Sequence, residues 1–441
     1  MRAGLARILF VAIVTLTACT VTLPAQPTQT PITTSYATVE AALRVLVEHQ
    51  VDRPSSKLLL GGAVDEIITS LQKQGTAPTA AAPSFTGKTD EDLQSFSDYL
   101  DVILQKTAGL AKNQLERTAV DGMAKSTHEC HTYYLDPDRA KNFNQPSREQ
   151  YSGIGARIQQ AAPNTSALPE ITQVFPGSPA EKAGLEMGDR IKTVDDKDVS
   201  GLTADEVANL IKGPAGSSVR LVIQHAGGDK QLTITRATLV VPDIVESMQS
   251  GKYGYVGISN ITANIPRDLQ DAMGRLDQGG AVGWVLDLRS DPGGLLDPAE
   301  QVASTFIKNG NILYEVDRNG NAAPKPVNPK AFYPRQKPLA VLVNRYSASG
   351  AEIIASAIQE HGSGRVFGEA TAGCISIALP RELPDGGLLL YTYARIQSGV
   401  RREDLSGKGV TPDEVVLRAP DEAGDKVLDA AVAWLRTQAQ P

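Results

Sequence analysis

Two near-continuous apolar runs constrain the fold more than any other feature of the chain. They read AVGWVLDLR at residues 281–289 and PLAVLVN at residues 338–344, and a helical stretch follows each of them. Strands of this kind, without alternation of polar and apolar residues, are typical of a parallel sheet that is covered on both faces. Because strands that alternate with helices indicate an α/β domain, we expect an α/β core over residues 241–441.

Two further regions precede this core. Residues 35–150 are mostly helical in pattern, and the stretch TVEAALRVLVEHQV at residues 38–51 places apolar side chains at helical spacing. Residues 151–240 instead contain short strand-like segments that are separated by glycine turns. The sequence therefore predicts a multidomain α/β protein with a helical N-terminal region, a β-rich middle domain and an α/β core.

The N-terminus has the pattern of a secretory signal. Arg2 and Arg7 precede an apolar run at residues 8–18, which is too short to span a bilayer. The run leads into LTAC, which ends at Cys19. This ending resembles the lipobox of bacterial lipoproteins, in which the cysteine is lipidated; a plain signal with a chance cysteine is the alternative. We expect a signal over residues 1–19, a Thr- and Pro-rich tether over residues 20–34, and a membrane-anchored, extracytoplasmic lipoprotein of a bacterial cell envelope.

The overall charge argues against nucleic acid as the main partner. The chain has 43 lysines and arginines against 50 acidic residues, which gives a net charge of −7. Binding to a phosphate backbone requires a basic face. An apolar content of 41% and a charged content of 21% are ordinary for a soluble globular protein, so composition alone assigns no activity.

The middle domain contains the motif GSPAEKAGL-x-x-GDRI at residues 177–191, preceded by YSGIGARI at residues 151–158. These stretches resemble a PDZ domain. A PDZ domain adds a peptide as an extra strand at a sheet edge, and free backbone N–H groups of a glycine turn capture the terminal carboxylate. Gly153, Ile154 and Gly155 are the candidate carboxylate-binding residues. The alternative is a small β-rich domain that only packs against its neighbour.

A serine at a strand–helix junction is the sharpest sign of chemistry. In LVNRYSASGAE, the strand ends near Asn344 and a helix begins near Gly350, so Ser349 lies at the positive end of that helix. Backbone N–H groups at such a junction can stabilise an oxyanion. The same residues also fit a capping box, with Ser349 as N-cap and Glu352 at N3, which is the structural alternative.

A glycine turn follows the other apolar run. The segment VLDLRSDPGG ends in Gly293 and Gly294, whose bare backbone can approach a substrate closely. The carboxyl ends of parallel strands meet at one edge of a sheet, where α/β proteins place their sites. We therefore expect the Gly293–Gly294 turn and the Gly350 amide to supply oxyanion donors next to Ser349.

The order of these elements resembles the C-terminal processing (tail-specific) serine peptidases over nearly the whole mature chain. A helical N-terminal region and a PDZ domain are followed by LDLR-x-x-PGG, SAS-x-x-E, GE-x-T-x-G and GKGVTPD. The resemblance implies a crotonase-like α/β peptidase core, Ser349 as nucleophile and a backbone oxyanion hole. It also implies a lysine base 25 residues after Ser349, where this chain has Cys374, and a supporting polar residue where it has Ala378.

The missing lysine leaves His131 as the candidate base. His131 lies in HECHTYYLDP, which resembles an HT-x-YL segment of the family, and the tricorn-like branch takes its base from a corresponding segment. A neutral imidazole can activate a serine hydroxyl. A purely structural histidine is the alternative, and a supporting role for Glu403 or Asp404 has no secure register.

Two other reactive arrangements carry less weight. His128 and His131 form an HxxH pair, but no third ligand is apparent, so we expect neither a metal ion nor another cofactor. Cys374 as the nucleophile would require a depressed thiol pKa, which a sequence cannot show. Cys130 and Cys374 are the only cysteines besides Cys19, and both flank the proposed site, so we predict that they form a disulfide.

The sequence therefore predicts a lipid-anchored, extracytoplasmic serine endopeptidase whose PDZ domain recognises the free C-terminal tails of its protein or peptide substrates. The alternative function is that of a catalytically inactive homologue that binds protein tails or acts as a scaffold. The replacement of the lysine by Cys374 is the feature that this alternative predicts.

Overall fold

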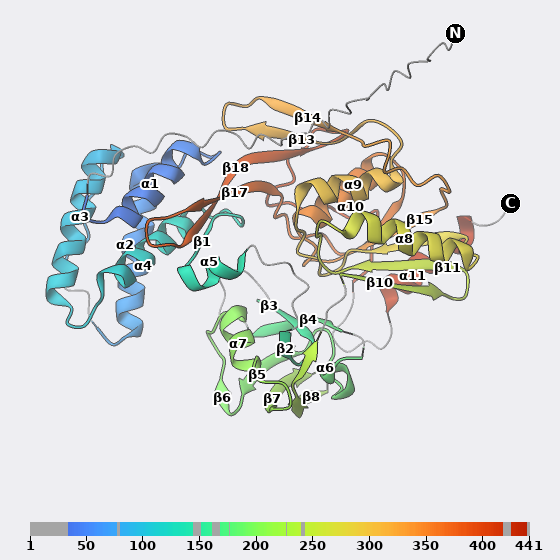
Figure 1. Cartoon of the computed structure of the whole chain (residues 1–441), viewed down its shortest axis with the longest axis horizontal. Helices are drawn as coiled ribbons and strands as arrows, with labels where there is room; N and C mark the ends of the chain where they lie inside the picture. The colour runs from blue at the N-terminus through green and yellow to red at the C-terminus, as the bar shows by residue number, and fades with distance from the viewer. Residues whose placement is uncertain are drawn as a thin grey trace, which may run out of the picture.

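The computed structural model describes residues 34–76, 80–143, 151–160, 168–175, 177–225, 227–239, 243–417 and 425–438. Cys19, the predicted signal and nearly all of the predicted tether lie outside these residues. Within them, no helix is both long enough and apolar enough to cross a membrane. Figure 1 shows a helical region at one end, the sheet-rich core at the other, and a small β-rich domain between and below them.

Four helices form the N-terminal region. They are α1 (Ala37–His49), α2 (Ser56–Lys73), α3 (Thr89–Lys106) and α4 (Lys112–Ser126). Helices α2 and α4 approach closely because glycines face each other at the crossing: a Cβ on Gly122 would lie 2.5 Å from the carbonyl oxygen of Gly62. The short strand β1 (Tyr133–Leu135) and helix α5 (Pro137–Phe143) follow. The predicted helical character of this region is confirmed.

The middle domain is built on one antiparallel sheet with the strand order β3-β4-β5-β7-β8. Its strands are β3 (Ala156–Gln160), β4 (Pro169–Val174), β5 (Arg190–Val194), β6 (Lys197–Asp198, paired with β5), β7 (Ser218–His225) and β8 (Gly228–Thr235), and its helices are α6 (Pro179–Lys182) and α7 (Ala204–Ile211). The first strand of the domain, β2 (Tyr151–Gly153), pairs with the last, β9 (Ala237–Leu239), so the two chain segments that connect the domain to the rest of the protein lie side by side.

The core contains a six-stranded sheet with the order β10-β11-β12-β15-β16-β19, in which all pairs except β10–β11 are parallel. The strands are β10 (Ile244–Gln249), β11 (Tyr253–Ile258), β12 (Gly283–Asp287), β15 (Leu339–Val343), β16 (Arg365–Gly368) and β19 (Glu414–Val415). Every residue of β12 and of β15 is buried. The predicted parallel sheet, covered on both faces, is therefore confirmed.

Helices cover both faces of this sheet. Helices α8 (Ile265–Gln278), α9 (Leu296–Phe306) and α10 (Gly350–Glu360) share one apolar cluster with Leu286 and Val341. On the opposite face, α11 (Lys426–Gln438) packs on Val285 and Leu342. Alternate residues of the same strands thus face opposite layers, as the pleat requires.

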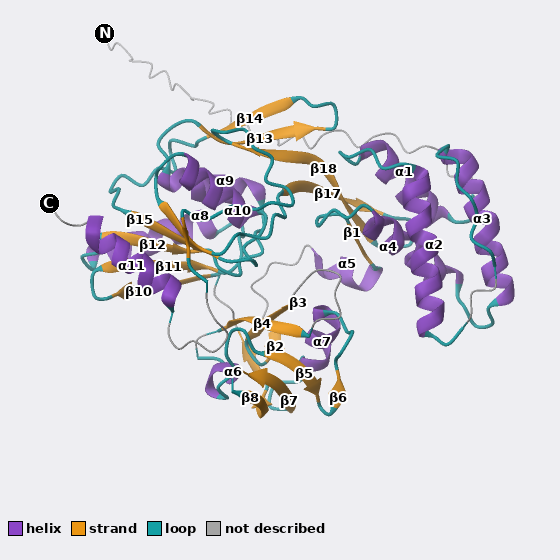
Figure 2. Cartoon of the chain, turned by 180° about the vertical axis from the view of Figure 1, so that it is seen from behind, coloured by secondary structure: helices purple, strands orange, loops and turns teal. Residues whose placement is uncertain are grey.

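A second sheet, which the sequence analysis did not predict, connects the helical region with the core. Its long strand β18 (Leu388–Ser398) pairs with β1, with β13 (Asn311–Asp317) and with β17 (Ser376–Glu382), and β14 (Ala322–Pro326) pairs with β13. Figure 2 shows β17 and β18 running from the core toward helices α1 and α4. β1 is the element that follows α4, so this pairing attaches the end of the helical region to the sheet that contains β17 and β18.

Candidate active site

Ser349 lies where two neighbouring parallel strands of the core end. Strands β12 and β15 pair in parallel, so the turn after β12 and the loop after β15 leave the same edge of the sheet. Gly293 in the turn has a φ of 93°, and a Cβ at this position would lie 2.8 Å from Cβ of Ser349 and 2.6 Å from the Gly350 nitrogen. Only glycine allows the turn to approach the serine this closely.

The backbone of Ser349 is held in an unfavourable conformation. Its φ of 52° and ψ of −114° place a non-glycine residue outside the common regions, at a cost of roughly 1–3 kcal/mol. Two acceptors fix its N–H group, namely the carbonyl oxygen of Cys374 and the carboxylate of Glu352, each at 2.9 Å. Such strain, when it is enforced by specific contacts, is typical of active-site residues.

Ser349 and Glu352 form the capping box that the sequence suggested, but the hydroxyl of Ser349 is not within hydrogen-bonding geometry of a cap amide. Within the described part of the chain it makes no hydrogen bond, and the amide of Glu352 donates to the carbonyl oxygen of Ser349 instead. The Glu352 carboxylate caps the Ser349 N–H, so only that half of the capping box contributes a side-chain hydrogen bond. The half-buried Ser349 hydroxyl therefore remains available for chemistry.

Glu352 is the fixed point of this site. Its side chain is fully buried and accepts hydrogen bonds from the Thr371 hydroxyl (2.6 Å), from the amides of Gly373 (2.7 Å) and Cys374 (2.9 Å), and from the amide of Ser349. Burial raises the pKa of Glu352, and these four donors act in the opposite direction. The carboxylate thereby joins the start of α10 to the segment that carries Cys374.

Two amides are available for a developing oxyanion. The N–H groups of Gly350 and Gly294 donate to no acceptor among the described residues, and Gly350 is the first residue of α10. The N–H of Gly293, by contrast, donates to Oδ1 of Asp291 at 2.8 Å. Gly293 could act as the predicted oxyanion donor only after release of this hydrogen bond, so its role as a donor stays a prediction, while its close approach to Ser349 is evident.

Asp291 connects the glycine turn with the residue before the nucleophile. Its Oδ1 holds the Gly293 amide, and its backbone oxygen accepts the Ala348 N–H at 2.9 Å. Its side chain is completely buried, and Oδ2 has no hydrogen-bond partner in the described structure. Burial raises the pKa of Asp291 to about 8, against the attraction of the Arg157 charge, while Asp243 contributes a further increase.

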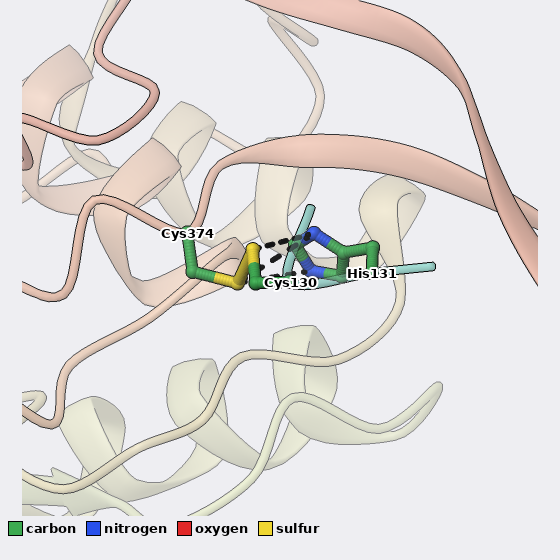
Figure 3. Close-up of side chains that lie close together, drawn as sticks. All are labelled: Cys130, His131 and Cys374. Carbon is green, nitrogen blue, oxygen red and sulfur yellow. Dashed lines mark hydrogen bonds between the residues drawn. A yellow bond between two sulfur atoms is a disulfide. The ribbon is translucent and has the colours of Figure 1, made fainter. Parts of the chain in front are cut away.

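Cys130 and Cys374, the two cysteines predicted to pair, form a disulfide in the structure, with Cα atoms 5.9 Å apart. Figure 3 shows the imidazole of His131 lying against this bond. Its Nδ1 is 3.4 Å from Sγ of Cys130 and 3.6 Å from Sγ of Cys374. The cysteine in the position of the family's lysine thus holds the predicted base segment beside the loop of Ser349.

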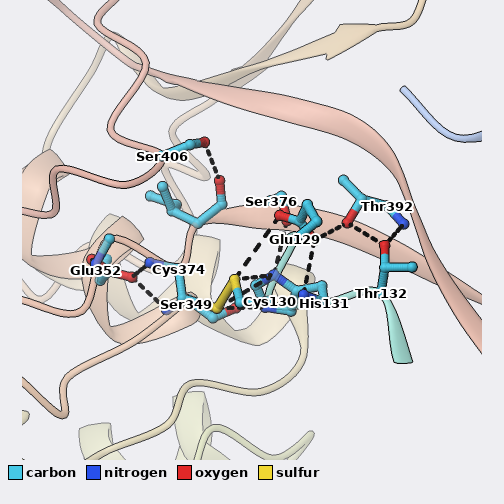
Figure 4. Close-up of a disulfide and its surroundings, with 12 residues drawn as sticks. Glu129, Cys130, His131, Thr132, Ser349, Glu352, Cys374, Ser376, Thr392 and Ser406 are labelled. Carbon is cyan, nitrogen blue, oxygen red and sulfur yellow. Dashed lines mark hydrogen bonds between the residues drawn. A yellow bond between two sulfur atoms is a disulfide. The ribbon is translucent and has the colours of Figure 1, made fainter. Parts of the chain in front are cut away.

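A hydroxyl and a carboxylate orient His131. Nδ1 lies 2.8 Å from Oγ of Ser376, and Ser376 donates its single proton to Glu129 at 2.9 Å (Figure 4). Because that proton is engaged, Nδ1 of the imidazole must be the donor and Nε2 carries the free lone pair. Glu129 also accepts the His131 N–H at 2.8 Å and the Thr392 hydroxyl. Burial lowers the pKa of His131.

The sequence analysis missed Glu129 and Ser376. Glu129 lies between His128 and Cys130 in the sequence, and Ser376 lies two residues after Cys374, but neither belongs to a motif. Arg395 from β18 adds an ion-pair contact of 3.7 Å to Glu129. The network therefore draws on three segments that are distant in sequence.

Other candidate residues lie outside this network. No hydrogen bond joins His131 to Ser349 in the described structure, although both flank Cys374. His128 is exposed and does not belong to the cluster of Cys130, His131 and Cys374. Glu403 and Asp404 are also exposed, and their hydrogen bonds are to Ser398 and Ser406 respectively. The structure thus gives neither acid an orienting role toward His131.

The predicted tail-binding residues lie at the open edge of the middle domain. Strand β3 is the edge strand of its sheet and pairs only with β4, and helix α7 packs against it. Gly153 is the last residue of β2, and Ile154 and Gly155 form the loop that leads into β3. The carbonyl oxygens of Ile154 and Gly155 accept the amides of Ala180 and Phe175 respectively. The N–H groups of Ile154 and Gly155 have no acceptor among the described residues, so they remain available.

The same strand contacts the core next to the glycine turn. Arg157 of β3 donates to the carbonyl oxygens of Ser259 (2.9 Å) and Ser290 (2.6 Å). The Ser290 hydroxyl in turn donates to the carbonyl oxygen of Thr172 in β4 at 2.9 Å. Ser290 directly precedes Asp291, so the middle domain is joined to the segment that positions the turn.

Comparisons with known proteins agree with this geometry. The profile of peptidase family S41 matches residues 252–416, and a PDZ-domain profile matches residues 170–225. The carboxy-terminal processing protease CtpA of Bacillus subtilis is 35% identical over 318 residues, which cover 71% of this chain and 66% of that protein. The carboxyl-terminal-processing protease of Synechocystis is 34% identical over 305 residues, 68% of this chain and 70% of that protein. This chain thus spans about two thirds of the length of each relative.

A solved structure shows the same architecture over almost the full length. The photosystem II D1 C-terminal processing protease aligns with a TM-score of 0.62 at 25% identity, over 92% of this chain and 98% of that protein. A putative S41 protease from Bacteroides fragilis aligns with a TM-score of 0.50 at 18% identity, which supports the fold alone. Helical region, PDZ domain and α/β core therefore occur together in a known arrangement.

Asp291 makes the stability of the protein pH-dependent. With a pKa of about 8 in the folded chain and about 3.9 when unfolded, it holds a proton between these values that the unfolded chain releases. Raising the pH from 5 to 8 should therefore cost the wild type up to about 1.4 kcal/mol per pH unit relative to Asp291→Asn, with no further divergence above pH 8. Urea unfolding at each pH measures this difference.

The matched control is Asp65→Asn, which removes an exposed carboxylate of α2 and should leave the wild-type pH profile unchanged. Parallel profiles for wild type and Asp291→Asn would show that the buried carboxyl has no raised pKa.

Proposed function

The chain belongs to peptidase family S41, as its resemblance to the C-terminal processing peptidases predicted, and we propose that it is a serine endopeptidase that cleaves protein substrates. The observation that carries the proposal is the state of Ser349. Its backbone is strained, its hydroxyl is unbonded among the described residues, and it directly precedes the unoccupied amide of Gly350 and contacts the turn in which Gly294 follows Gly293. A helix cap needs none of these features, whereas an acyl-transfer nucleophile uses all three.

In the proposed mechanism, the Ser349 hydroxyl attacks the scissile carbonyl while Nε2 of His131 accepts its proton. The amides of Gly350 and Gly294 stabilise the oxyanion that forms, and His131 then protonates the leaving amine. Water hydrolyses the acyl-enzyme by the reverse sequence of proton transfers. Support for His131 comes from Ser376 and Glu129, which fix the tautomer with the lone pair on Nε2. Catalytic hydrogen bonds are often longer in free enzymes, so binding of a substrate has to bring the two groups together.

Substitution of either group should abolish cleavage to a similar degree. We expect Ser349→Ala and His131→Ala each to lower kcat/KM for a protein substrate at least about 10³-fold, and the double variant to be little worse, because the two act as one unit. His128→Ala is the control, since this exposed histidine lies three residues away and outside the network. Steady-state cleavage assays measure all four variants.

The outcome also separates the two candidate functions. Full activity of His131→Ala together with an inert Ser349→Ala would refute the assignment of the base. The absence of the family's lysine and of a Ser349–His131 hydrogen bond favours the alternative of an inactive, tail-binding homologue. That alternative is correct if the wild type neither cleaves protein substrates nor is labelled at Ser349 by a serine-directed phosphonate.

We propose further that the PDZ domain binds the free C-terminal tail of the substrate. The open edge of β3 and the available amides of Ile154 and Gly155 support strand addition with capture of a carboxylate. Arg157 supports a link from the bound tail to the active site, because it reaches the carbonyl oxygen of Ser290.

Removal of the tail's charge should test carboxylate capture. We expect a peptide with a C-terminal amide to bind at least tenfold more weakly than the same peptide with a free acid, a loss of about 1.4 kcal/mol. Fluorescence anisotropy with the Ser349→Ala variant measures binding without cleavage. Equal dissociation constants for acid and amide, at low and at high salt, would exclude recognition of the terminal carboxylate.

The proposed location is the outer side of a bacterial membrane, through a lipid on Cys19. This proposal rests on the signal-like run at residues 8–18 and the LTAC box. We expect wild-type protein in the membrane fraction with an acyl mass on its first mature residue, and Cys19→Ser in the soluble fraction. Membrane retention of Cys19→Ser, with no acyl mass on the wild type, would refute the anchor.

A further inference from the structure

Three ligand-type side chains meet beside Ser349 in a way that neither the peptidase mechanism nor the family comparison explains. One ligand atom from each of Cys130, His131 and Cys374 lies within 4.8 Å of the other two. The sequence analysis dismissed a metal site because the pair of His128 and His131 lacked a third ligand. The fold brings a different set together, in which Cys374 supplies the missing ligand and His128 takes no part.

The separations between nitrogen and sulfur already suit a tetrahedral ion. Zinc binds cysteine sulfur at about 2.3 Å and histidine nitrogen at about 2.0–2.1 Å, so the two ligand atoms lie about 3.6 Å apart at a tetrahedral angle. In the structure, Nε2 of His131, the nitrogen that Ser376 does not occupy, lies 3.8 Å from Sγ of Cys374. The other nitrogen, Nδ1, lies 3.4 Å from Sγ of Cys130 and 3.6 Å from Sγ of Cys374, so both sulfurs lie against the imidazole. The two sulfurs are bonded to each other, so they can serve as ligands only after reduction and rotation of the side chains toward the lone pair of Nε2.

We propose that reduction of the Cys130–Cys374 disulfide creates a Cys₂His site for Zn²⁺, formed by these two thiolates and Nε2 of His131. Rotation of the two short side chains has to move the sulfurs to about 3.8 Å from each other, the separation of two thiolates on one tetrahedral zinc ion. Three protein ligands leave the fourth position to solvent. Thiolate and imidazole together favour zinc over the hard cations calcium and magnesium.

The outer contacts of a metal-binding histidine are already in place. A ligating imidazole usually donates its other ring N–H to a neighbouring acceptor, which fixes the ring. Here Nδ1 donates to Ser376 at 2.8 Å, and Ser376 donates to Glu129, whose carboxylate is held by Thr392 and Arg395. This arrangement leaves Nε2, which lies 3.8 Å from Sγ of Cys374, as the ligand atom.

The redox step needs a dithiol as reductant, or a phosphine, which attacks one sulfur and is then hydrolysed to the phosphine oxide with water supplying the oxygen and the two thiol protons. A thiolate of a dithiol attacks Sγ of Cys130, the exposed partner, and Cys374 leaves as a thiolate that takes up a proton. The second thiol then attacks the mixed disulfide, so that the protein gains two electrons and two protons while the dithiol is oxidised to a disulfide. Zn²⁺ displaces the two thiol protons when it binds.

Zinc binding would also inhibit the peptidase activity, and this consequence rests on the proposed function. A metal ion on Nε2 occupies the lone pair with which His131 would accept the Ser349 proton. The oxidised protein would then be the active form, and the reduced, zinc-bound protein the inactive form.

Cobalt(II) is the probe for the site, because thiolate ligation gives it a ligand-to-metal charge-transfer band and tetrahedral geometry gives it intense visible bands. The full chain is reduced with a phosphine, which does not compete strongly for the metal, and titrated with Co²⁺ under argon. We expect one equivalent to bind, Zn²⁺ to displace it, and the oxidised protein to show neither band. Circular dichroism before and after reduction reports whether the fold is retained.

Variants assign the ligands. Cys130→Ser and Cys374→Ser should abolish the charge-transfer spectrum of the one-to-one complex, and His131→Ala should weaken binding at least tenfold. Ser376→Ala should weaken it by about 10- to 100-fold through loss of the outer contact. His128→Ala is the matched control and should bind as the wild type does.

A reduced protein that stays folded without a stoichiometric charge-transfer band overturns the proposal, and so does unfolding on reduction, because the site requires the three residues to stay in place. Equal binding by His131→Ala also overturns it. The spectrum is independent of catalysis: a band in the reduced protein, together with no phosphonate labelling of Ser349 in the oxidised, metal-free protein, would mean that the metal site is real and the proposed peptidase function is wrong.

Discussion

The active site depends on one buried carboxylate, that of Glu352. A charged group without solvent is stable only when hydrogen bonds replace the water that it loses, and four donors around Glu352 do so. Those donors come from the start of α10 and from the segment of residues 371–374 after β16, so satisfying the carboxylate fixes these two segments relative to each other. The strained backbone of Ser349 follows from this arrangement, because its N–H must reach both Glu352 and the Cys374 carbonyl oxygen.

A second chain of contacts runs from the PDZ domain to the oxyanion turn. Arg157 and Thr172 hold Ser290 from two neighbouring strands, and Ser290 has a φ of 59°, which is again unfavourable for a residue other than glycine. The next residue, Asp291, then holds the Gly293 amide and the Ala348 amide. A movement of β3 on tail binding would therefore act on the backbone beside Ser349 without any direct contact between peptide and nucleophile.

The sequence was sufficient for features that depend on local patterns. The apolar runs predicted β12 and β15, and the strand–helix junction and the Gly-Gly turn predicted where Ser349 and its amides lie. The hydrogen bond from the Gly293 amide to the Asp291 side chain was not predicted, although Asp followed by proline and glycine is a turn pattern in which the aspartate often accepts an amide two residues on. The roles of Glu129 and Ser376 could not be predicted from the sequence, since their hydrogen bond joins residues 247 positions apart and neither residue belongs to a motif. The second sheet was missed for the same reason, because β1 and β18 pair across a comparable separation.

The replacement of the family's lysine by Cys374 changes what holds the site together. A lysine at this position would bring its own nitrogen to the serine from within the core, whereas a disulfide sulfur has no proton to exchange. The imidazole next to it comes from His131, which lies outside the matched peptidase range of residues 252–416. The proposed base is therefore delivered by the helical region, through the β1–β18 pairing and one covalent bond. It follows that the reactivity of Ser349 is tied to the docking of a separate region and to the redox state of that bond, a dependence that a lysine in the core would not create.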